Sequence, residues 1–560
     1  MPPEAASYAA DLAQAVNAFD RPRVEALCDK IIRDVASRRL KLEPKEAGSI
    51  LGTLRRKRHF TLTEKVGAAF VAAGRTEPVV WRQYAQALIE QKKMTGALAV
   101  LSRVIASTSA GDDEHLEALG LTGRTYKQHY IDLADQQAEA PHARQALIHA
   151  TAVYHDVFRQ YPDKLWHGIN AVALTHRAGA DGIALPMTVD AAGMSAAILA
   201  SVEAKIAETK SEVYAFDVAT ALEACVALGR WTEALVWADR YVKHEGSDAF
   251  EIASTLRQLT EVWRLGPLSN DGGSIIVLLQ AHLLAREGGQ VSFTPPQLTS
   301  RRLQSVSEQL QAQFGSEEML PLRQLQRGIE RCQSVAMITR TSGIGFGTGF
   351  VVSAAELGFG SKDELLLLTN AHVVSDDLKV HKRLAAEFPN RPPLWPQEAR
   401  VHFSLDDVRH QIDKVLWTSD PWTLDATLLR LAPRLTKRQE CPLNTNRGRI
   451  EEAYRRVYVI GHPGGRELTF SLSDNKVLGF RSPKLHYRTP TEGGSSGSPV
   501  FTADWDVLAL HHAGSEKMST LDAKAEYPAN EGIWIEAIRR GLARKKRAGA
   551  SRAKGTRKHN

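Results

Sequence analysis

The feature that most constrains this chain is a short stretch rich in glycine and serine, Gly494-Ser-Ser-Gly-Ser-Pro499. Because glycine lacks a Cβ, Gly494 and Gly497 have access to backbone angles that are closed to other residues. A tight turn there would aim the amides of Gly494 and Ser496 at one point, where an oxyanion would be stabilised. The stretch therefore predicts a reactive Ser496 beside an oxyanion hole, with a plain Gly/Ser loop as the alternative.

A histidine and an aspartate lie beside apolar strands earlier in the chain. His372 follows the run Leu365–Thr369, and Asp425 directly precedes the apolar run Ala426–Leu431. A lone histidine at the end of an apolar strand is usually a packed core residue, but its place ahead of Ser496 favours a catalytic role. Asp420 is the competing carboxylate, although the strand follows Asp425 directly. A histidine, an aspartate and a serine can form a catalytic triad, and the chain order His, Asp, Ser is one of several in which such a triad occurs.

These motifs closely resemble those of bacterial trypsin-like serine proteases of the HtrA type, which have the chymotrypsin fold. The Gly-rich turn that runs into the apolar stretch 349–353 is similar to theirs as well. The resemblance implies an all-β double β-barrel with His372, Asp425 and Ser496 as the catalytic triad. It also implies an oxyanion hole made by Gly494 and Ser496, and a reaction that needs no metal and no cofactor.

The same resemblance indicates where the primary specificity pocket would lie. This pocket binds P1, the substrate residue on the N-terminal side of the bond that is cleaved. Its wall and floor would include His512, Ala513, Gly514, Thr489 and Pro490. None of these is acidic, so a preference for Arg or Lys has no counter-charge and the P1 residue is left open. Ser495 stands where zymogen-activated trypsins have an aspartate. We therefore expect the helical half, or a partner bound to it, to control the active-site loops.

The first half of the chain is predicted to be an array of helix pairs. Trp81–Leu88 followed by Gly96–Leu101 has the pattern of one pair, and Ala219–Ala234 has that of another. Small residues permit close helix contact, and no pair of this kind buries its apolar face alone. The spacing is typical of tetratricopeptide-type (TPR) repeats.

Two segments of this half, Glu117–Lys127 and Gly168–Leu174, resemble the TRAFs-binding region of apoptosis-signal-regulating kinases. The resemblance implies a TPR-like scaffold that binds a protein partner or holds a neighbouring domain. Arg124, Tyr126, Trp166 and Asn170 are interpreted as inter-helix packing residues, with a ligand site as the alternative.

Composition bounds the compartment and the partners. The four cysteines are scattered, which favours a reducing compartment. The sequence has no apolar run long enough to span a membrane, and its first residues do not resemble a secretory signal. We expect a cytoplasmic protein. The net charge of +7 comes from residues 542–560, which carry eight Lys or Arg and no acid. This tail is predicted to be disordered and solubilising, with nonspecific contact to nucleic acid as the alternative.

The sequence thus predicts a multidomain protein: an all-α helical-repeat half and an all-β chymotrypsin-like half. Its predicted function is that of an intracellular serine endopeptidase acting on protein or peptide, recruited or regulated through the repeats, in stress or phage defence. A catalytically inactive adaptor with the same fold is the alternative, and a nucleic-acid-associated scaffold is a second. The predicted segments are an N-terminal helical segment (1–69), a TPR-like domain (70–265), a helical connector (266–332), a protease domain (333–541) and a basic tail (542–560).

Overall fold

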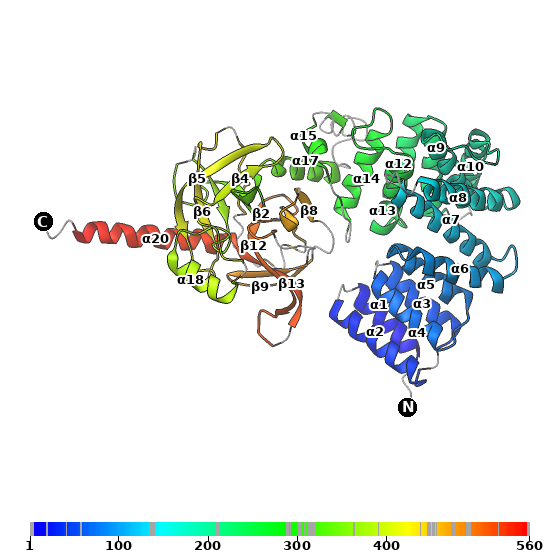
Figure 1. Cartoon of the computed structure of the whole chain (residues 1–560), viewed down its shortest axis with the longest axis horizontal. Helices are drawn as coiled ribbons and strands as arrows, with labels where there is room; N and C mark the ends of the chain where they lie inside the picture. Colours follow the sequence, from blue (N-terminus) through cyan, green and yellow to red (C-terminus); the bar gives the residue numbers. More distant parts are fainter. Residues whose placement is uncertain are drawn as a thin grey trace. The chain divides into compact units, whose positions relative to one another are not determined.

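The computed structural model describes most of the chain and separates it into two compact units, Met1–Leu279 and Gln280–Asn560. Each unit is described by itself (Figure 1). The described residues are 5–17, 21–40, 42–56, 59–134, 140–208, 213–286, 291, 293–300, 305–306, 310, 320–361, 364–389, 391–436, 438–444, 450, 454, 456–466, 468–471, 476–488, 494–524 and 526–556.

The first unit is all-α, as predicted, and most of its helices pack on the next one along the chain (Figure 1). Short connections between consecutive helices are typical of such arrays. The helices are α1 (Ala5–Asn17), α2 (Arg21–Ala36), α3 (Pro44–Arg56), α4 (Phe60–Ala72), α5 (Pro78–Glu90), α6 (Met94–Ser107), α7 (Asp113–Leu133), α8 (Ala140–Gln160), α9 (Leu165–Ala180), α10 (Ala191–Ala207), α11 (Ala215–Ala227), α12 (Trp231–Lys243), α13 (Ala249–Arg257), the π-helix η2 (Gln258–Val262) and α14 (Gly273–Ala285).

The residues singled out in α7 and α9 pack between helices. Arg124 pairs with Glu90 of α5, and the ring of Tyr126 contacts that of His149 on α8. Trp166 stands edge-on to Tyr154, and the Asn170 side chain accepts a hydrogen bond from Lys127. These contacts agree with the packing interpretation.

The second unit begins at Gln280, within α14, and continues with the helices α15 (Pro295–Thr299) and α17 (Leu320–Cys332) and a closed six-stranded barrel. The barrel order is β1-β2-β3-β6-β5-β4, and one cluster of buried aliphatic and aromatic side chains fills it. Residues 302–314 of the predicted helical connector lie largely outside the described residues. The barrel strands are β1 (Val335–Arg340), β2 (Gly345–Ser353), β3 (Leu365–Thr369), β4 (Ala399–Phe403), β5 (Val408–Thr418) and β6 (Thr427–Ala432), with helix α18 (Leu378–Glu387) after β3.

A seven-stranded sheet follows, in the order β8-β7-β11-β12-β13-β10-β9, and completes the predicted all-β half. The strand β11 pairs with β12, and β12 pairs with the long β13, so chain segments far apart in sequence become neighbours. The strands are β7 (Tyr458–Gly461), β8 (Thr469–Ser471), β9 (Val477–Arg481), β10 (Lys484–Tyr487), β11 (Pro499–Phe501), β12 (Val507–Ser519) and β13 (Glu526–Trp534), with the short 3-10 helix η3 (Pro463–Gly465) after β7.

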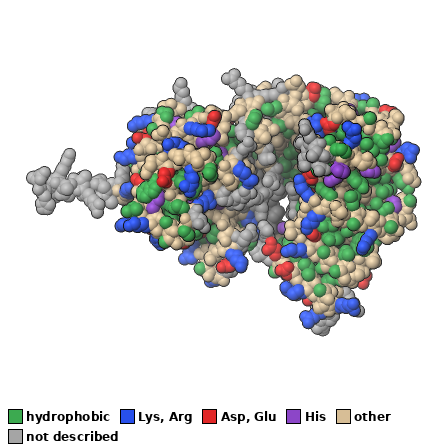
Figure 2. Space-filling model, in the orientation of Figure 1, with side chains coloured by type: hydrophobic (Ala, Val, Ile, Leu, Met, Phe, Trp, Pro, Cys, Tyr) green, Lys and Arg blue, Asp and Glu red, His purple; other side chains and the backbone are tan. Residues whose placement is uncertain are grey.

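The last helix corrects the prediction of a disordered tail. Helix α20 (Ile535–Thr556) begins in the buried segment Ile535–Ile538 and continues through most of residues 542–560. Ala, Lys and Arg are strong helix formers, so a helix started by packing extends into a segment rich in these residues. On the face that Figure 2 shows, Lys and Arg side chains are scattered rather than gathered in one patch.

Among the described residues, no helix combines the length and the apolar character that crossing a membrane requires. The predicted domain boundaries remain predictions.

Candidate active site

His372 lies in the turn that follows β3, where the chain leaves the first barrel. The amides of the next two residues, Val373 and Val374, both donate to the carbonyl of Asn370, which fixes this turn. The His372 side chain is 26% exposed, so one edge of the ring is open to an approaching group. The predicted general base is thus at the surface of a rigid barrel.

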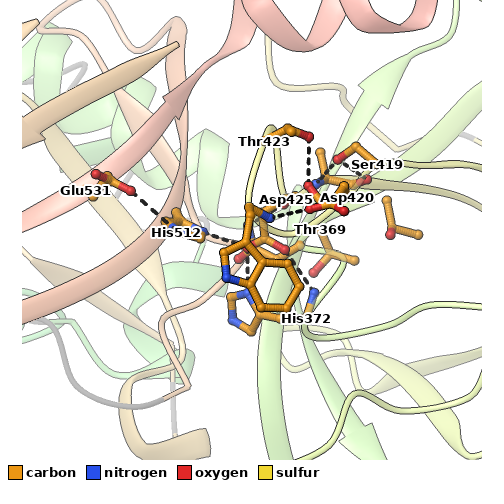
Figure 3. A network of polar contacts seen from close by, with 12 residues as sticks. Thr369, His372, Ser419, Asp420, Thr423, Asp425, His512 and Glu531 are labelled. Atoms are coloured by element: carbon orange, nitrogen blue, oxygen red, sulfur yellow. Dashed lines mark hydrogen bonds and ion pairs between the residues drawn. The ribbon is translucent and has the colours of Figure 1, made fainter. Parts of the chain in front are cut away.

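Asp425 is fully buried beside His372 (Figure 3). Its Oδ1 accepts the His372 amide at 3.0 Å, and its Oδ2 accepts Nδ1 of the imidazole at 2.5 Å. Asn370 donates to the Asp425 carbonyl at 2.8 Å, and this brings the two loops together. The backbone of Asp425 has φ of 41°, an unfavourable angle for a non-glycine residue that such surrounding contacts must stabilise.

Burial alone would raise the pKa of the Asp425 carboxyl, but the imidazoles of His372 and His512 outweigh it. Its pKa therefore lies below the usual value. Asp420, the competing aspartate, instead accepts the amide of Trp422 at 2.8 Å and pairs with Arg383 at 3.3 Å. Of these two acids, Asp425 is the one that contacts His372.

The turn that carries Ser496 has the positive backbone φ angles that its glycines suggest. Gly494 and Gly497 have φ of 103° and 88°. A Cβ on Gly497 would lie 2.0 Å from the carbonyl oxygen of Thr348, so this position has no room for a side chain. The Ser496 carbonyl accepts the Thr348 amide at 2.8 Å, and the Gly497 amide donates to the His511 carbonyl at 3.0 Å.

Gly347 of β2 connects the serine turn and the histidine turn. A Cβ there would be 2.6 Å from Val373, the neighbour of His372, and 3.4 Å from the Ser496 carbonyl oxygen. The Ser496 hydroxyl makes no hydrogen bond to His372, and within the described part of the chain the Gly494 and Ser496 amides have no acceptor. Catalytic hydrogen bonds are often long in an enzyme without substrate.

His512 is the residue whose role the sequence did not indicate. It was predicted to form a pocket wall, but its side chain turns to Asp425, with Nδ1 2.7 Å from Oδ2 (Figure 3). Its Nε2 lies 3.5 Å from Oε1 of Glu531, a buried acid of β13. No local pattern in the sequence indicates this pair of contacts.

The other predicted pocket residues have no tested role. Ala513 and Gly514 lie on β12, opposite Glu531 and Asn530 of β13. Thr489 and Pro490 lie outside the described residues. The pocket remains a prediction.

His372, Asp425 and His512 also form the cluster of potential metal ligands found among the described residues, with ligand atoms within 4.8 Å of one another. Two ligands at about 2.0–2.1 Å from a tetrahedral Zn²⁺ would be roughly 3.3 Å apart. The separations of 2.5 and 2.7 Å are shorter and fit protons shared between nitrogen and oxygen. No metal is assigned to this cluster.

Two further buried histidines in this unit have lowered pKa values. Burial lowers the pKa of His462 to about 4 and that of His511 to about 3, so both are neutral at pH 7. His462 follows β7, and its Nδ1 lies 2.9 Å from the Arg466 carbonyl. This contact closes the turn after the strand.

Comparisons with known proteins support both halves. Residues 347–510 match the family described as "Trypsin-like peptidase domain", and residues 61–175 match "Tetratricopeptide Repeats-Sensor". The chain therefore contains a trypsin-like peptidase domain preceded by a TPR-like repeat domain.

Curated relatives match over parts of their length. The uncharacterized protein y4fB of Sinorhizobium fredii is 26% identical over 239 residues, which are 38% of this chain and 32% of that protein. A glutamyl endopeptidase of Staphylococcus epidermidis is 33% identical over 103 residues, 17% of this chain and 35% of that enzyme. The chain thus spans about a third of the length of these relatives.

Similar solved structures include bacterial proteases. The active form of the Rv3671c protease from M. tuberculosis has 18% identity and a TM-score of 0.27, covering 39% of this chain and 82% of that chain. The serine endoprotease from Yersinia pestis has 15% identity and a TM-score of 0.28, covering 40% and 67%.

Proposed function

We propose that this chain, which contains a trypsin-like peptidase domain, is a serine endopeptidase that cleaves a protein substrate. The observation that supports this most is the buried Asp425 carboxylate, which accepts both the amide and the imidazole of His372. This pair lies next to the glycine-flanked turn that carries Ser496. The same contacts argue against a catalytically inactive adaptor, because an adaptor has no need of them.

In the proposed reaction, His372 takes the proton from the Ser496 hydroxyl as its oxygen attacks the substrate carbonyl. Asp425 holds the imidazole in the required tautomer and stabilises the imidazolium that forms. The amides of Gly494 and Ser496, which have no acceptor among the described residues, would donate to the oxyanion. His372 then protonates the leaving amine, and water hydrolyses the acyl-enzyme by the reverse use of the same groups.

The test is covalent labelling of the full chain with a fluorophosphonate probe, with the modified residue mapped by mass spectrometry. We expect labelling at Ser496 and its loss in Ser496→Ala. Ser498→Ala is the matched control, because the Ser498 hydroxyl is buried and has no partner among the described residues. Absence of labelling in a folded wild-type chain, with cell extract present as a source of partner, would favour the adaptor.

We also propose that the enzyme prefers Glu or Gln at P1. His511 lies on β12, and its Nδ1 is 2.6 Å from the Tyr487 hydroxyl. If that hydroxyl donates, the neutral ring retains Nε2–H as a donor for a carboxylate or amide oxygen. The similarity to a glutamyl endopeptidase supports the same preference. Peptides that differ only at P1 test it, and faster cleavage after Lys or Leu would contradict it.

The repeats are proposed to bind a protein partner that controls the protease, in a cytoplasmic stress or phage-defence response. The four cysteines are free and buried, which supports a reducing compartment. A site-specific protease site placed between residues 286 and 291 permits the chain to be cut after α14, between the repeats and the peptidase domain, once the protein is purified. If cutting there changes neither the labelling rate nor its response to cell extract, regulation by the repeats is excluded. Loss of phage resistance in Ser496→Ala cells would support the defence role.

A further inference from the structure

One carboxylate oxygen in the site is shared by two imidazoles. Oδ2 of Asp425 is 2.5 Å from Nδ1 of His372 and 2.7 Å from Nδ1 of His512 (Figure 3). The centroids of the two rings are 6.0 Å apart, and the rings meet edge to face. The proposed mechanism uses only one of these imidazoles, so the second requires an explanation.

The far side of His512 meets a second carboxylate. Its Nε2 is 3.5 Å from Oε1 of Glu531, which also accepts Lys484 Nζ at 3.0 Å. The other oxygen of Glu531 is 2.9 Å from Nε2 of His486, whose Nδ1 is 2.8 Å from the Tyr527 hydroxyl. His512 therefore lies between two buried acids, and Lys484 is the fixed cation beside them.

The charges of this group require one more proton. Asp425 and Glu531 bear two negative charges and Lys484 one positive, which leaves one negative charge unbalanced. A neutral His512 would direct a nitrogen lone pair at one of its two carboxylates, whereas the imidazolium donates from both nitrogens. His486 does not meet this condition, since its second nitrogen faces a hydroxyl that either donates or accepts.

We propose that His512 is a resident imidazolium that holds Asp425 between two rings and keeps His372 in the neutral form that a general base requires. This inference rests on the proposed function. His512 is a positioning residue, because it acts on the reacting groups through Asp425.

The directions in which the pKa values of His512 and Glu531 are shifted agree with a charged His512 between two acids. Burial would lower the pKa of His512, but its hydrogen bond and charge interaction with Asp425, and then Glu531, outweigh burial and raise it. Burial would raise the pKa of Glu531, but His486 and Lys484, and then His512, lower it. Among the described residues, the other titratable neighbours that these interactions involve are His372 and the neutral His511.

The expected consequence is a shift in the acid limb of activity. With a positive charge on His512, Asp425 attracts a protonated His372 less strongly. A unit charge at about 6 Å corresponds to roughly 0.5 to 2 pH units for effective dielectric constants between about 80 and 20. His512→Ser removes the charge and retains a hydroxyl near Asp425, so the midpoint of the acid limb is expected to rise by that amount.

The experiment measures the rate of fluorophosphonate labelling of the full chain between pH 5 and 9. His512→Ser and Glu531→Gln are both expected to raise the midpoint, with the smaller rise in Glu531→Gln. His402→Gln is the control, since His402 pairs with the exposed Asp407. An unmoved midpoint in both folded variants overturns the proposal.

A second measurement does not depend on activity. A histidine whose pKa is raised by folding contributes stability below the unfolded value of about 6.5 and loses it as pH rises through the folded value. Thermal midpoints of wild type and His512→Ser should therefore differ more at pH 6 than at pH 9. A difference independent of pH overturns the charge assignment. If the wild-type chain is never labelled, the proposed function is refuted. The comparison of thermal midpoints still decides whether His512 is charged.

Discussion

Replacing Gly497 by alanine tests how the serine turn is held against the first barrel. The added Cβ would lie 2.0 Å from the Thr348 carbonyl oxygen and 2.5 Å from the Thr369 hydroxyl. Gly343, in the turn between β1 and β2, is the matched control. Its φ of 85° is close to the 88° of Gly497, but nothing lies within 4 Å of an added Cβ.

The magnitudes follow from these geometries. Forcing an L-residue into left-handed backbone angles costs about 1–2 kcal/mol, and both variants incur this cost. Only Gly497→Ala adds an overlap with backbone, and overpacking costs about 1–3 kcal/mol more. The free energy of unfolding should fall by about 1–2 kcal/mol for Gly343→Ala and about 2–5 kcal/mol for Gly497→Ala.

Two measurements on the full chain check this difference. Urea unfolding reports the free energies, and the rate of fluorophosphonate labelling reports the position of Ser496. A displacement of about 1 Å is expected to slow labelling about 10²-fold in Gly497→Ala, with little change in Gly343→Ala. Equal losses of stability, or equal labelling rates, would show that the contact with Thr348 does not hold the turn.

Three further predictions concern other parts of the chain. In α9, Gly168→Ala should lower the thermal midpoint, because its Cβ would lie 2.7 Å from a phenylalanine ring. Gly179→Ala in the same helix should raise it slightly, because nothing lies within 4 Å there. Asp425→Asn should slow labelling about 10³–10⁴-fold, whereas Asp420→Asn should change it less than threefold. His462 is neutral when folded, so the unfolded chain binds the extra proton below about pH 6.5. Stability should therefore fall by up to roughly 3 kcal/mol as pH drops to about 4, and His462→Gln should reduce that loss when thermal midpoints are compared at pH 7 and 5.

The features that were predictable are those in which neighbours in sequence are neighbours in space. Leu365–Thr369 forms a strand because its leucines are buried on the barrel, and the histidine follows where that strand ends. The glycines around Ser496 indicate the positive φ angles that the turn has. Helix pairs at regular spacing indicate a repeat array, since most helices pack on the next one along the chain.

The end of the chain and the surroundings of Asp425 were not predictable in this way. Helix α20 extends into the basic tail because packing at its first turn starts it, and composition alone does not reveal that packing.

The residues alone determined two halves of different class and the kinds of group that a protease site needs, because strands, turns and helix spacing depend on local chemistry. Which groups meet at the buried carboxylate was decided only by the tertiary structure. The pairing of β12 with β13 brings Glu531 close to His512, 19 positions away along the chain. Asp425 belongs to the turn before β6 of the closed barrel, 87 positions before His512, so this contact depends on how the sheet packs against the barrel. No local pattern encodes such a meeting, because it joins segments that are far apart in the chain.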